Sequence, residues 1–251
     1  MEEYNPFRLD GKSILVTGAS SGIGRGIAVA CAKMGCNLFI TGRNNEKLEQ
    51  TRIEASTEKV TIVPSDITRD EEIEKLVAQL PALDGIVHCA GISNSVLCKQ
   101  IKRSDIEHVF ATNFTGTVLL QTSLIKNKKL NKGGSIVFIT SMATESPALG
   151  NALYSASKAA MESYSKVLGL ELAPKKIRVN CISPAMVWTD LILTGVMDKS
   201  FHEEAEKKYP LGRYGKPEDI APLAVYLLSD GSSWMDGSII NLTGGGEGTL
   251  N

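Results

Sequence analysis

The sequence predicts one α/β domain, a doubly wound parallel sheet of seven strands with helices on both faces. Short β-branched runs alternate along the chain with longer segments of helical period, which is typical of βαβ units. The chain has 251 residues, 43% of them hydrophobic, enough for one sizeable core but short for two full enzyme domains. Because no Pro/Ser-rich linker, repeat or low-complexity tract breaks the alternation, a single domain is expected over residues 1–251.

Each predicted strand is a short β-branched run bounded by Gly, Pro, Asn or Asp. The seven runs are residues 13–17, 37–41, 60–64, 85–89, 135–140, 178–182 and 238–242. Helical period marks residues 24–34, 70–80, 104–125, 152–172 and 217–228 between them. The first of these helices opens on a glycine-rich loop. The last has Pro217, Glu218 and Asp219 in its first turn, where acidic side chains complement the helix dipole.

Residues 185–216 interrupt this rhythm with a long connection whose helical pattern is weak and confined to residues 201–208. A compact fold normally joins its elements with a few residues. The connection follows the C-terminal end of a predicted strand, which is where α/β sheets bind ligands. We therefore interpret residues 185–216 as a lid. The alternative is a peripheral helical insertion without a role in binding.

Composition excludes several classes of function. Lys and Arg number 27 against 28 Asp and Glu, so no general field attracts nucleic acid or anionic lipid. No apolar run reaches the roughly 20 residues of a membrane helix, and the acidic start does not resemble a signal peptide. The five cysteines form no CxxC pair and only three histidines are present. Reduced thiols, no metal site and a cytoplasmic location are therefore expected.

A glycine-rich loop follows the first predicted strand and leads directly into the first helix. Gly18 suits a tight turn, Gly22 lets the backbone approach a pyrophosphate, and Gly24 lets the helix pack closely on the strand. The helix N-terminus adds unpaired N–H groups that bind an anion. Strand, loop and helix together indicate a dinucleotide-binding site rather than a merely flexible connection.

The glycine spacing, TGxxxGxG, resembles that of the short-chain dehydrogenase/reductase family, and the likeness runs from Asp10 to Gly245. The resemblance implies a Rossmann fold and hydride transfer with a nicotinamide cofactor. It also implies cofactor contacts in the glycine loop and after the fourth and sixth strands. These contacts are Gly18, Ser20, Ser21, Gly22, Ile23, Gly24, Cys89, Ala90, Gly91, Pro184, Val187 and Thr189.

The end of the second predicted strand bears on the choice of cofactor. An acidic side chain there would bind the ribose 2′-hydroxyl of NAD, but this chain has Arg43. An arginine suits a 2′-phosphate, so NADP(H) is predicted; the alternative is a solvated surface charge. The resemblance implies that Asp66 contacts the adenine amino group and that Ile67 lies beside the ring. A loop-capping role for Asp66 is the competing interpretation.

Tyr154 and Lys158 stand four residues apart in a predicted helix, so both can face one site. An adjacent ammonium stabilises a phenolate and brings the phenol pKa of about 10 closer to neutral pH. The resemblance implies that Tyr154 donates a proton and that Lys158 also holds the nicotinamide ribose. It further implies that Ser141 hydrogen-bonds the substrate oxygen and that Asn113 positions a water in a proton relay.

Three positions depart from the family pattern. His88 and Cys89 replace two asparagines, and Ala185 replaces a glycine. We expect Cys89 to be harmless because its position acts mainly through the backbone. The His88 imidazole is expected to hydrogen-bond backbone as a satisfied core histidine. The loop at Ala185 is expected to adjust slightly, since alanine has less backbone freedom than glycine.

Residues 211–219 and 241–245 most resemble the 3-oxoacyl-[acyl-carrier-protein] reductase branch of the family. This implies NADPH-dependent reduction of a ketone to a secondary alcohol. The alternatives are another small or hydrophobic ketone or secondary alcohol, and a non-catalytic NADP(H)-sensing protein. The apolar lid side chains suit an acyl chain or merely pack the lid helix. They are Leu191, Ile192, Leu193, Val196 and Met197.

Two expectations concern macromolecular partners. Local basic runs predict a docking site for an acidic carrier protein, or else the solvated end of a helix. The runs are Lys126, Lys128, Lys129 and Lys132, with Lys175 and Lys176 farther on. The resemblance also implies a homotetramer or homodimer, formed through the apolar faces of helices 104–125 and 152–172 and the last strand region.

Overall fold

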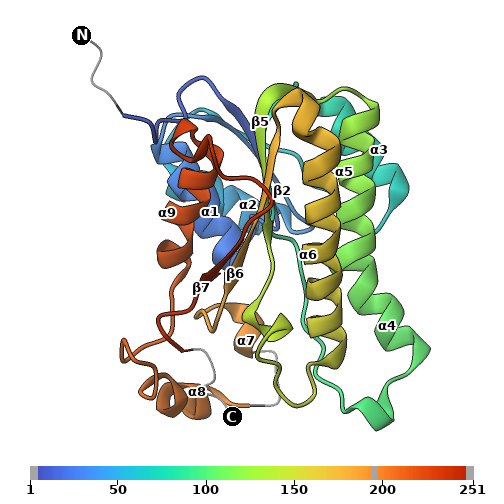
Figure 1. Ribbon diagram of the computed structural model, residues 1–251, viewed down its shortest axis with the longest axis vertical. Helices are drawn as coiled ribbons and strands as arrows, with labels where there is room; N and C mark the ends of the chain where they lie inside the picture. Colours follow the sequence, from blue (N-terminus) through green and yellow to red (C-terminus); the bar gives the residue numbers. More distant parts are fainter. Residues whose placement is uncertain (1–4, 194–196, 247–251) are drawn as a thin grey trace.

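The computed structural model describes residues 5–193 and 197–246 (Figure 1). Seven parallel strands form one sheet in the order β3-β2-β1-β4-β5-β6-β7. Their bounds are β1 Ser13–Thr17, β2 Asn37–Thr41, β3 Val60–Ile62, β4 Leu83–His88, β5 Leu130–Ile139, β6 Arg178–Pro184 and β7 Ile239–Leu242. The predicted doubly wound parallel sheet is confirmed.

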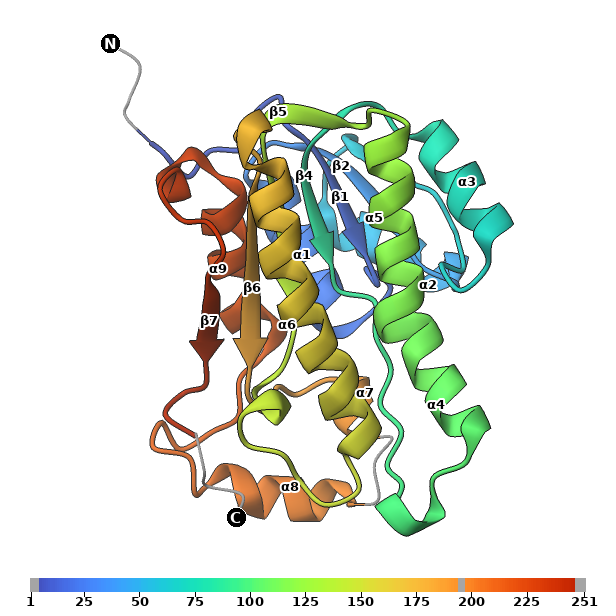
Figure 2. The same ribbon diagram turned by 45° about the vertical axis from the view of Figure 1, so that its right-hand side comes forward.

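Helices cover both faces of this sheet (Figures 1 and 2). On one face pack α1 (Gly22–Lys33), α2 (Asn45–Ala55) and α9 (Pro217–Leu228); on the other pack α3 (Asp70–Gln79), α5 (Thr117–Lys126) and α6 (Ala152–Leu172). Successive strand residues enter opposite cores, so Val16 joins the first and Leu15 the second. Burial on both faces explains why the strands are nearly continuous apolar runs.

The helix predicted as continuous over residues 104–125 is interrupted in the structure. A π-helical turn, Ala111–Gly116, joins α4 (Arg103–Phe110) to α5. At Gly116 a Cβ atom would lie 2.3 Å from the carbonyl oxygen of Ile67, so only glycine allows this approach. The wider turn also holds Asn113, whose side chain bonds backbone outside the helix. Such π turns are frequent at functional sites.

Helix α2 is missing from the sequence-based prediction because its apolar pattern is weak. Only Leu48, Thr51 and Ala55 of its 11 residues are buried. The Asn44 side chain accepts a hydrogen bond from the Lys47 backbone N–H at 2.9 Å, which is helix N-capping. That capping residue is the signal that identifies the start of this helix.

Residues 185–193 and 197–216, the described part of this connection, form a small layer beyond the carboxyl ends of the strands, at the bottom of Figure 1. The layer contains α7 (Asp190–Leu193) and α8 (Lys199–Glu206), so the helix expected over 201–208 lies slightly earlier. Trp188 donates a hydrogen bond from Nε1 to the Glu206 carboxylate at 2.7 Å and packs against the fully buried Tyr214. Val196 lies outside the described residues.

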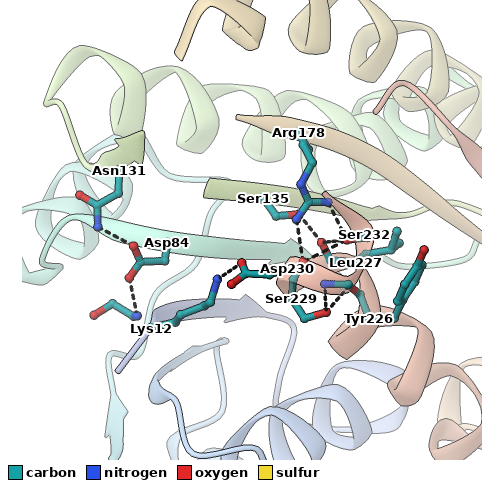
Figure 3. Close-up of polar contacts among 12 residues, drawn as sticks. Lys12, Asp84, Asn131, Ser135, Arg178, Tyr226, Leu227, Ser229, Asp230 and Ser232 are labelled. Atoms are coloured by element: carbon teal, nitrogen blue, oxygen red, sulfur yellow. Dashed lines mark hydrogen bonds and ion pairs between the residues drawn. The ribbon is translucent and has the colours of Figure 1, made fainter. Parts of the chain in front are cut away.

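Figure 3 shows a polar network near the amino ends of the strands, opposite this layer. The Asp84 carboxylate accepts hydrogen bonds from the Ser13 N–H and the Asn131 side chain, both at 2.8 Å, and so joins β1, β4 and β5. Arg178 at the start of β6 donates to the Ser232 hydroxyl at 2.7 Å. Side chains therefore link the strands at their amino ends, and the loops at their carboxyl ends are free to form a functional site.

His88, the last residue of β4, is a core histidine as expected, but it bonds a different partner. Its Nε2 lies 2.9 Å from Oε1 of Gln121 on α5, and its ring stacks on Phe138 with centroids 4.8 Å apart. The ring points into the core between β5 and α5, so it meets a side chain rather than backbone. Burial lowers the pKa of His88 to about 4. Among the described residues Nδ1 has no partner, so a proton there would be buried and unpaired.

We predict that the protein loses stability as the pH falls from about 6.5 to about 4. Unfolded His88 has a pKa near 6.5 and folded His88 near 4, so the unfolded chain binds more protons in this window. The full loss is about 3 kcal/mol. Urea unfolding at about pH 7 and about pH 5 should show a smaller loss for His88→Asn than for the wild type. Equal losses would contradict this assignment.

Candidate active site

Three glycines let the loop between β1 and α1 approach neighbouring backbone. Gly18 has φ +65°, and a Cβ there would lie 2.8 Å from the Cα of Ala90, in the loop after β4. At Gly24 a Cβ would lie 2.3 Å from the Gly18 carbonyl oxygen. At Gly22, with φ +52°, it would lie 3.0 Å from the Thr189 methyl group. The loops after β1, β4 and β6 therefore meet at the predicted glycine motif.

The N-terminus of α1 offers hydrogen-bond donors to an anion. Ser21 occupies the N-cap position in an extended conformation, its side chain makes no capping hydrogen bond, and the first turn has no acidic side chain. Amides of this turn, that of Ile23 included, have no intrahelical acceptor. The free amides of this turn fit the pyrophosphate of a dinucleotide. A groove of about 750 Å³ also begins at Ser21 and Gly22, but it follows the outer side of α1 to Lys33, and none of the predicted catalytic residues lines it.

Thr17 joins the two loops at the point where the strand order reverses. Its Oγ1 accepts hydrogen bonds from the N–H groups of Cys89 at 3.0 Å and Ala90 at 3.1 Å. No role was predicted for Thr17; the available signal is a threonine at a strand end directly before Gly18. Burial raises the pKa of the Cys89 thiol to about 12, so the side chain stays neutral while its amide makes this contact.

The four predicted catalytic residues come from the π turn, the end of β5 and α6, all near the carboxyl edge of the sheet. Lys158 Nζ lies 5.7 Å from the centroid of the Tyr154 ring. Lys158 is only 6% exposed, and Nζ donates to the Ile139 carbonyl at 2.8 Å. This bond attaches α6 to Ile139, the last residue of β5. Ser141 follows two residues later. Tyr154, Lys158 and Ser141 are thus held by two adjoining rigid elements.

Asn113 connects the π turn to both the loop after β4 and α6. Its Oδ1 accepts from the Ile92 N–H at 2.8 Å, and Nδ2 donates to the Ile92 carbonyl at 2.9 Å and to the Ser157 hydroxyl at 3.0 Å. A Cβ on Gly91 would lie 3.4 Å from Lys158 Nζ and 3.5 Å from Asn113 Oδ1. The structure therefore brings Asn113, Gly91 and Lys158 together as one cluster.

Arg43 and Asp66 follow β2 and β3 at the same edge. Arg43 is exposed, and among the described residues no hydrogen bond or ion pair engages its guanidinium. Asp66 Oδ1 accepts from the N–H and hydroxyl of Thr68 at 3.0 and 2.8 Å. Burial opposes ionisation of Asp66, but these bonds and the charge of Arg43 lower its pKa. Asp66 thus makes the loop-capping bonds of the competing interpretation, and its adenine contact stays a prediction.

Ile67 and Val187, two of the predicted cofactor contacts, are largely buried in the structure. Ile67 is 6% exposed and packs in the core that contains α3 and α5. Val187 is 5% exposed and pairs in parallel with Gly215. The Thr189 hydroxyl donates to the Val187 carbonyl at 3.4 Å, next to the glycine loop. Ala185 avoids positive φ, so the loop after Pro184 accommodates it without strain. Contacts of these residues with a cofactor remain expectations.

Within residues 5–193 and 197–246, no three or more His, Cys, Asp or Glu side chains gather in a way that could hold a metal ion. Over the same residues, no helix combines the length and apolar character needed to cross a membrane. The five cysteines are free thiols.

Comparison with known proteins assigns the family. The profile described as Enoyl-(Acyl carrier protein) reductase matches residues 18–247. The 3-oxoacyl-[acyl-carrier-protein] reductase FabG of Rickettsia bellii is 36% identical over 237 residues, 94% of this chain and 97% of that protein. A crystal structure of a short-chain type dehydrogenase/reductase from Mycobacterium marinum superimposes with a TM-score of 0.88 at 31% identity, covering 97% of this chain and 98% of that one.

A second solved structure carries a different title. It is a short-chain dehydrogenase/reductase from Brucella melitensis, titled glucose/ribitol dehydrogenase, with a TM-score of 0.88 at 30% identity and coverage of 96% of this chain and 98% of that one. Sequence and structure therefore agree on the fold, the glycine motif and the family. The chain belongs to the short-chain dehydrogenase/reductase family, oxidoreductases that use a nicotinamide cofactor.

Proposed function

We propose that the protein is an NADPH-dependent oxidoreductase that reduces a ketone to a secondary alcohol, working as one catalytic domain over residues 1–251. The observation that carries the proposal is the buried Lys158 ammonium beside the Tyr154 ring, at the sheet edge that also holds the glycine loop. A cofactor-sensing protein without chemistry would have no use for this pair. The intact set of Tyr154, Lys158 and Ser141 therefore favours an enzyme.

Tyr154 serves as the general acid and gives its hydroxyl proton to the ketone oxygen, to which Ser141 donates a hydrogen bond. When bound, the nicotinamide cofactor supplies the hydride. Lys158 stabilises the phenolate left on Tyr154. Its ammonium bonds a neutral carbonyl, and within the described part of the chain no ion pair neutralises it. Its positive charge therefore favours the phenolate that forms when Tyr154 gives up its proton.

Asn113 has a narrower role than the resemblance implies. Both of its amide hydrogens are committed, one to the Ile92 carbonyl and one to the Ser157 hydroxyl. A relay water would therefore be held through an oxygen of Asn113, on the side chain or the backbone. The bonds to Ile92 also fix the loop that contains Gly91, so Asn113 positions this loop against Lys158.

Arg43 supports the choice of NADP(H). It follows β2, where the adenosine ribose lies in this fold, and its exposed guanidinium is available to a 2′-phosphate. An acidic residue at this position would repel that phosphate, and none is present. Asp66 lies nearby, after β3, and its carboxylate already accepts two hydrogen bonds from Thr68.

Exposed apolar side chains around the active-site edge favour a hydrophobic ketone. Leu149 is 95% exposed in the loop before α6, and Leu97 is 46% exposed in the loop after β4. The two loops touch, since the Val96 N–H donates to the Gly150 carbonyl at 2.9 Å. Leu193 and Met197 of the proposed lid are also exposed. These exposed apolar side chains suit an acyl chain. The relatives named 3-oxoacyl-[acyl-carrier-protein] reductase support a substrate of this kind.

The basic runs give weaker support to a carrier-bound substrate. Lys129 donates to the carbonyl of Leu80, so it caps the end of α3. The run of residues 126–132 extends from the end of α5 into the start of β5, at the edge of the sheet opposite Ser141. The Lys129 contact and the position of the run favour the alternative, in which these lysines belong to the end of a helix, over a docking site for an acidic carrier protein. The proposed substrate is therefore a hydrophobic ketone that need not be carried by a protein, and a small ketone or secondary alcohol is the alternative.

We further propose that the protein works in the cytoplasm as a homotetramer. Five free thiols, three of them fully buried, fit a reducing compartment. On α6, Val167 is 54% and Leu170 78% exposed, and Leu119 on the neighbouring α5 is 39% exposed. Helices α5 and α6 lie side by side on one outer face (Figure 2). Association through this face would cover these side chains.

Sedimentation equilibrium at micromolar concentration should give the mass of a tetramer. Val167→Asp with Leu170→Asp should shift the distribution towards smaller species, because a charge would be buried unpaired in the interface. A wild type that sediments only as a monomer would overturn the assembly.

Arg43→Asp should reverse the cofactor preference. Removing the guanidinium loses its bond to the 2′-phosphate, and the new carboxylate repels that phosphate while it can accept from the 2′-hydroxyl of NADH. We expect the kcat/KM ratio of NADPH to NADH to fall at least about 100-fold. Equal or better use of NADH by the unmodified protein would contradict the assignment to NADP(H).

Tyr154→Phe should abolish ketone reduction and leave NADPH binding nearly intact, since the hydroxyl is needed only at the reacting oxygen. The expected loss in kcat is on the order of 10²–10⁴-fold or more. Lys158→Ala should lower both kcat and cofactor affinity, and Ser141→Ala chiefly kcat. NADPH absorbance follows turnover and fluorescence titration gives the Kd. Most of the kcat surviving in Tyr154→Phe would favour the cofactor-sensing alternative.

A further inference from the structure

Two residues outside the predicted site form hydrogen bonds to the backbone of the glycine loop from the side of α1 and α2. The Thr51 hydroxyl, on α2, donates to the carbonyl of Ala19 at 2.8 Å. Arg25, on α1, donates from Nη2 to the carbonyl of Ser20 at 2.7 Å. The two side chains are themselves joined, because Arg25 Nε donates to Thr51 Oγ1 at 3.1 Å. Two successive carbonyls of the loop are thus fixed by one hydrogen-bonded pair.

The pair joins a side chain of the protein interior to one at its surface, since the Arg25 side chain is 24% exposed. Thr51 is fully buried. The Arg25 guanidinium is also fixed by an ion pair of 3.2 Å with Glu54, one turn along α2. A buried Thr51 hydroxyl needs partners to offset its desolvation. It accepts from Arg25, and its proton has the Ala19 carbonyl at 2.8 Å as the nearer acceptor and the Lys47 carbonyl on α2 at 3.1 Å as a second one. The loop is thereby attached to α2, which begins next to Arg43.

Peptide geometry gives this attachment a consequence for binding. In a trans peptide the C=O and N–H groups point in opposite directions. Because the Ala19 and Ser20 carbonyls are held towards α1 and α2, the N–H groups of the following residues, Ser20 and Ser21, point away from those helices. They therefore point towards the space in front of the loop, where the N-terminus of α1 also presents its amides.

We propose that Thr51 and Arg25 are positioning residues that set the direction of the phosphate-binding amides in the glycine loop. The inference rests on the proposed nicotinamide site, but it concerns affinity for both cofactors and not the choice between them. These residues orient backbone amides that face a pyrophosphate, and both NADPH and NADH contain this group. Arg43, in contrast, addresses only the 2′-phosphate. The two roles predict different patterns of affinity.

The test compares substitutions that differ by one hydroxyl. Thr51→Val keeps the shape of the side chain and leaves the Ala19 carbonyl and Arg25 Nε without their partner. Thr51→Ser retains the hydroxyl. Thr41→Val is a matched control, since the Thr41 hydroxyl is buried at the end of β2 and, within the described residues, bonds nothing. Arg25→Met supplies a second test should Thr51→Val fold poorly.

The readouts are Kd values for NADPH and NADH by fluorescence titration, together with kcat at saturating cofactor. We expect Thr51→Val and Arg25→Met to raise both Kd values about tenfold with kcat nearly unchanged. Thr51→Ser and Thr41→Val should stay within about twofold of the wild type. Unchanged Kd values in Thr51→Val and Arg25→Met, or a loss confined to NADPH, would overturn the proposal.

Hydrogen exchange in the cofactor-free protein separates this inference from the proposed function. Thr51→Val should exchange the amides of residues 18–24 faster than the wild type, whereas Thr41→Val should not. If the wild type binds neither nucleotide, the proposed function fails, and faster exchange in Thr51→Val still shows that the pair orders the loop. Equal exchange in all variants would refute the positioning role.

Discussion

The close approach of backbone between the ends of β1 and β4 is the constraint on which the site depends. Only glycine at position 18 lets the first loop lie against Ala90, and the Thr17 hydroxyl fastens the two loops by bonding both amides after β4. The strand order reverses between these neighbours, and this is the place where open α/β sheets bind ligands. The contact between the two loops therefore fixes the base of the candidate site.

A second constraint is the buried ammonium of Lys158. Removing a charge from water is costly, and a single carbonyl, that of Ile139, offsets only part of the cost. The charge therefore gains from any negative group that forms next to it, and the Tyr154 ring lies 5.7 Å from Lys158 Nζ. Gly91 and the π turn at Asn113 shape the space around it. The energetic demand of burial and the needs of proton transfer are thus met by the same arrangement.

These constraints explain which features could be predicted from the sequence. The strands and helices α1, α6 and α9 follow from apolar period and glycine punctuation, because burial on both faces leaves a strong local pattern. Helix α2 has little buried surface, and the π turn depends on the contact of Gly116 with Ile67, far away in sequence. The partner of His88 depends likewise on the packing of α5. Thr51 gives no local signal at all, because its role arises only when α2 packs on the loop.

In the proposed function, chemistry and substrate choice depend on different parts of the fold, a division that would explain why relatives at similar distance carry such different names. Ser141 lies two residues after the end of β5 and Lys158 lies on α6, both next to the main cores, whereas Leu97 and Leu149 lie on exposed loops. The layer of residues 185–216 has its own small core around Tyr214 and its own Trp188–Glu206 hydrogen bond. It can therefore change its exposed residues without disturbing the sheet. Under the proposed function, substitution along these loops alters which ketone reaches Tyr154 and leaves proton transfer by Tyr154 as it is.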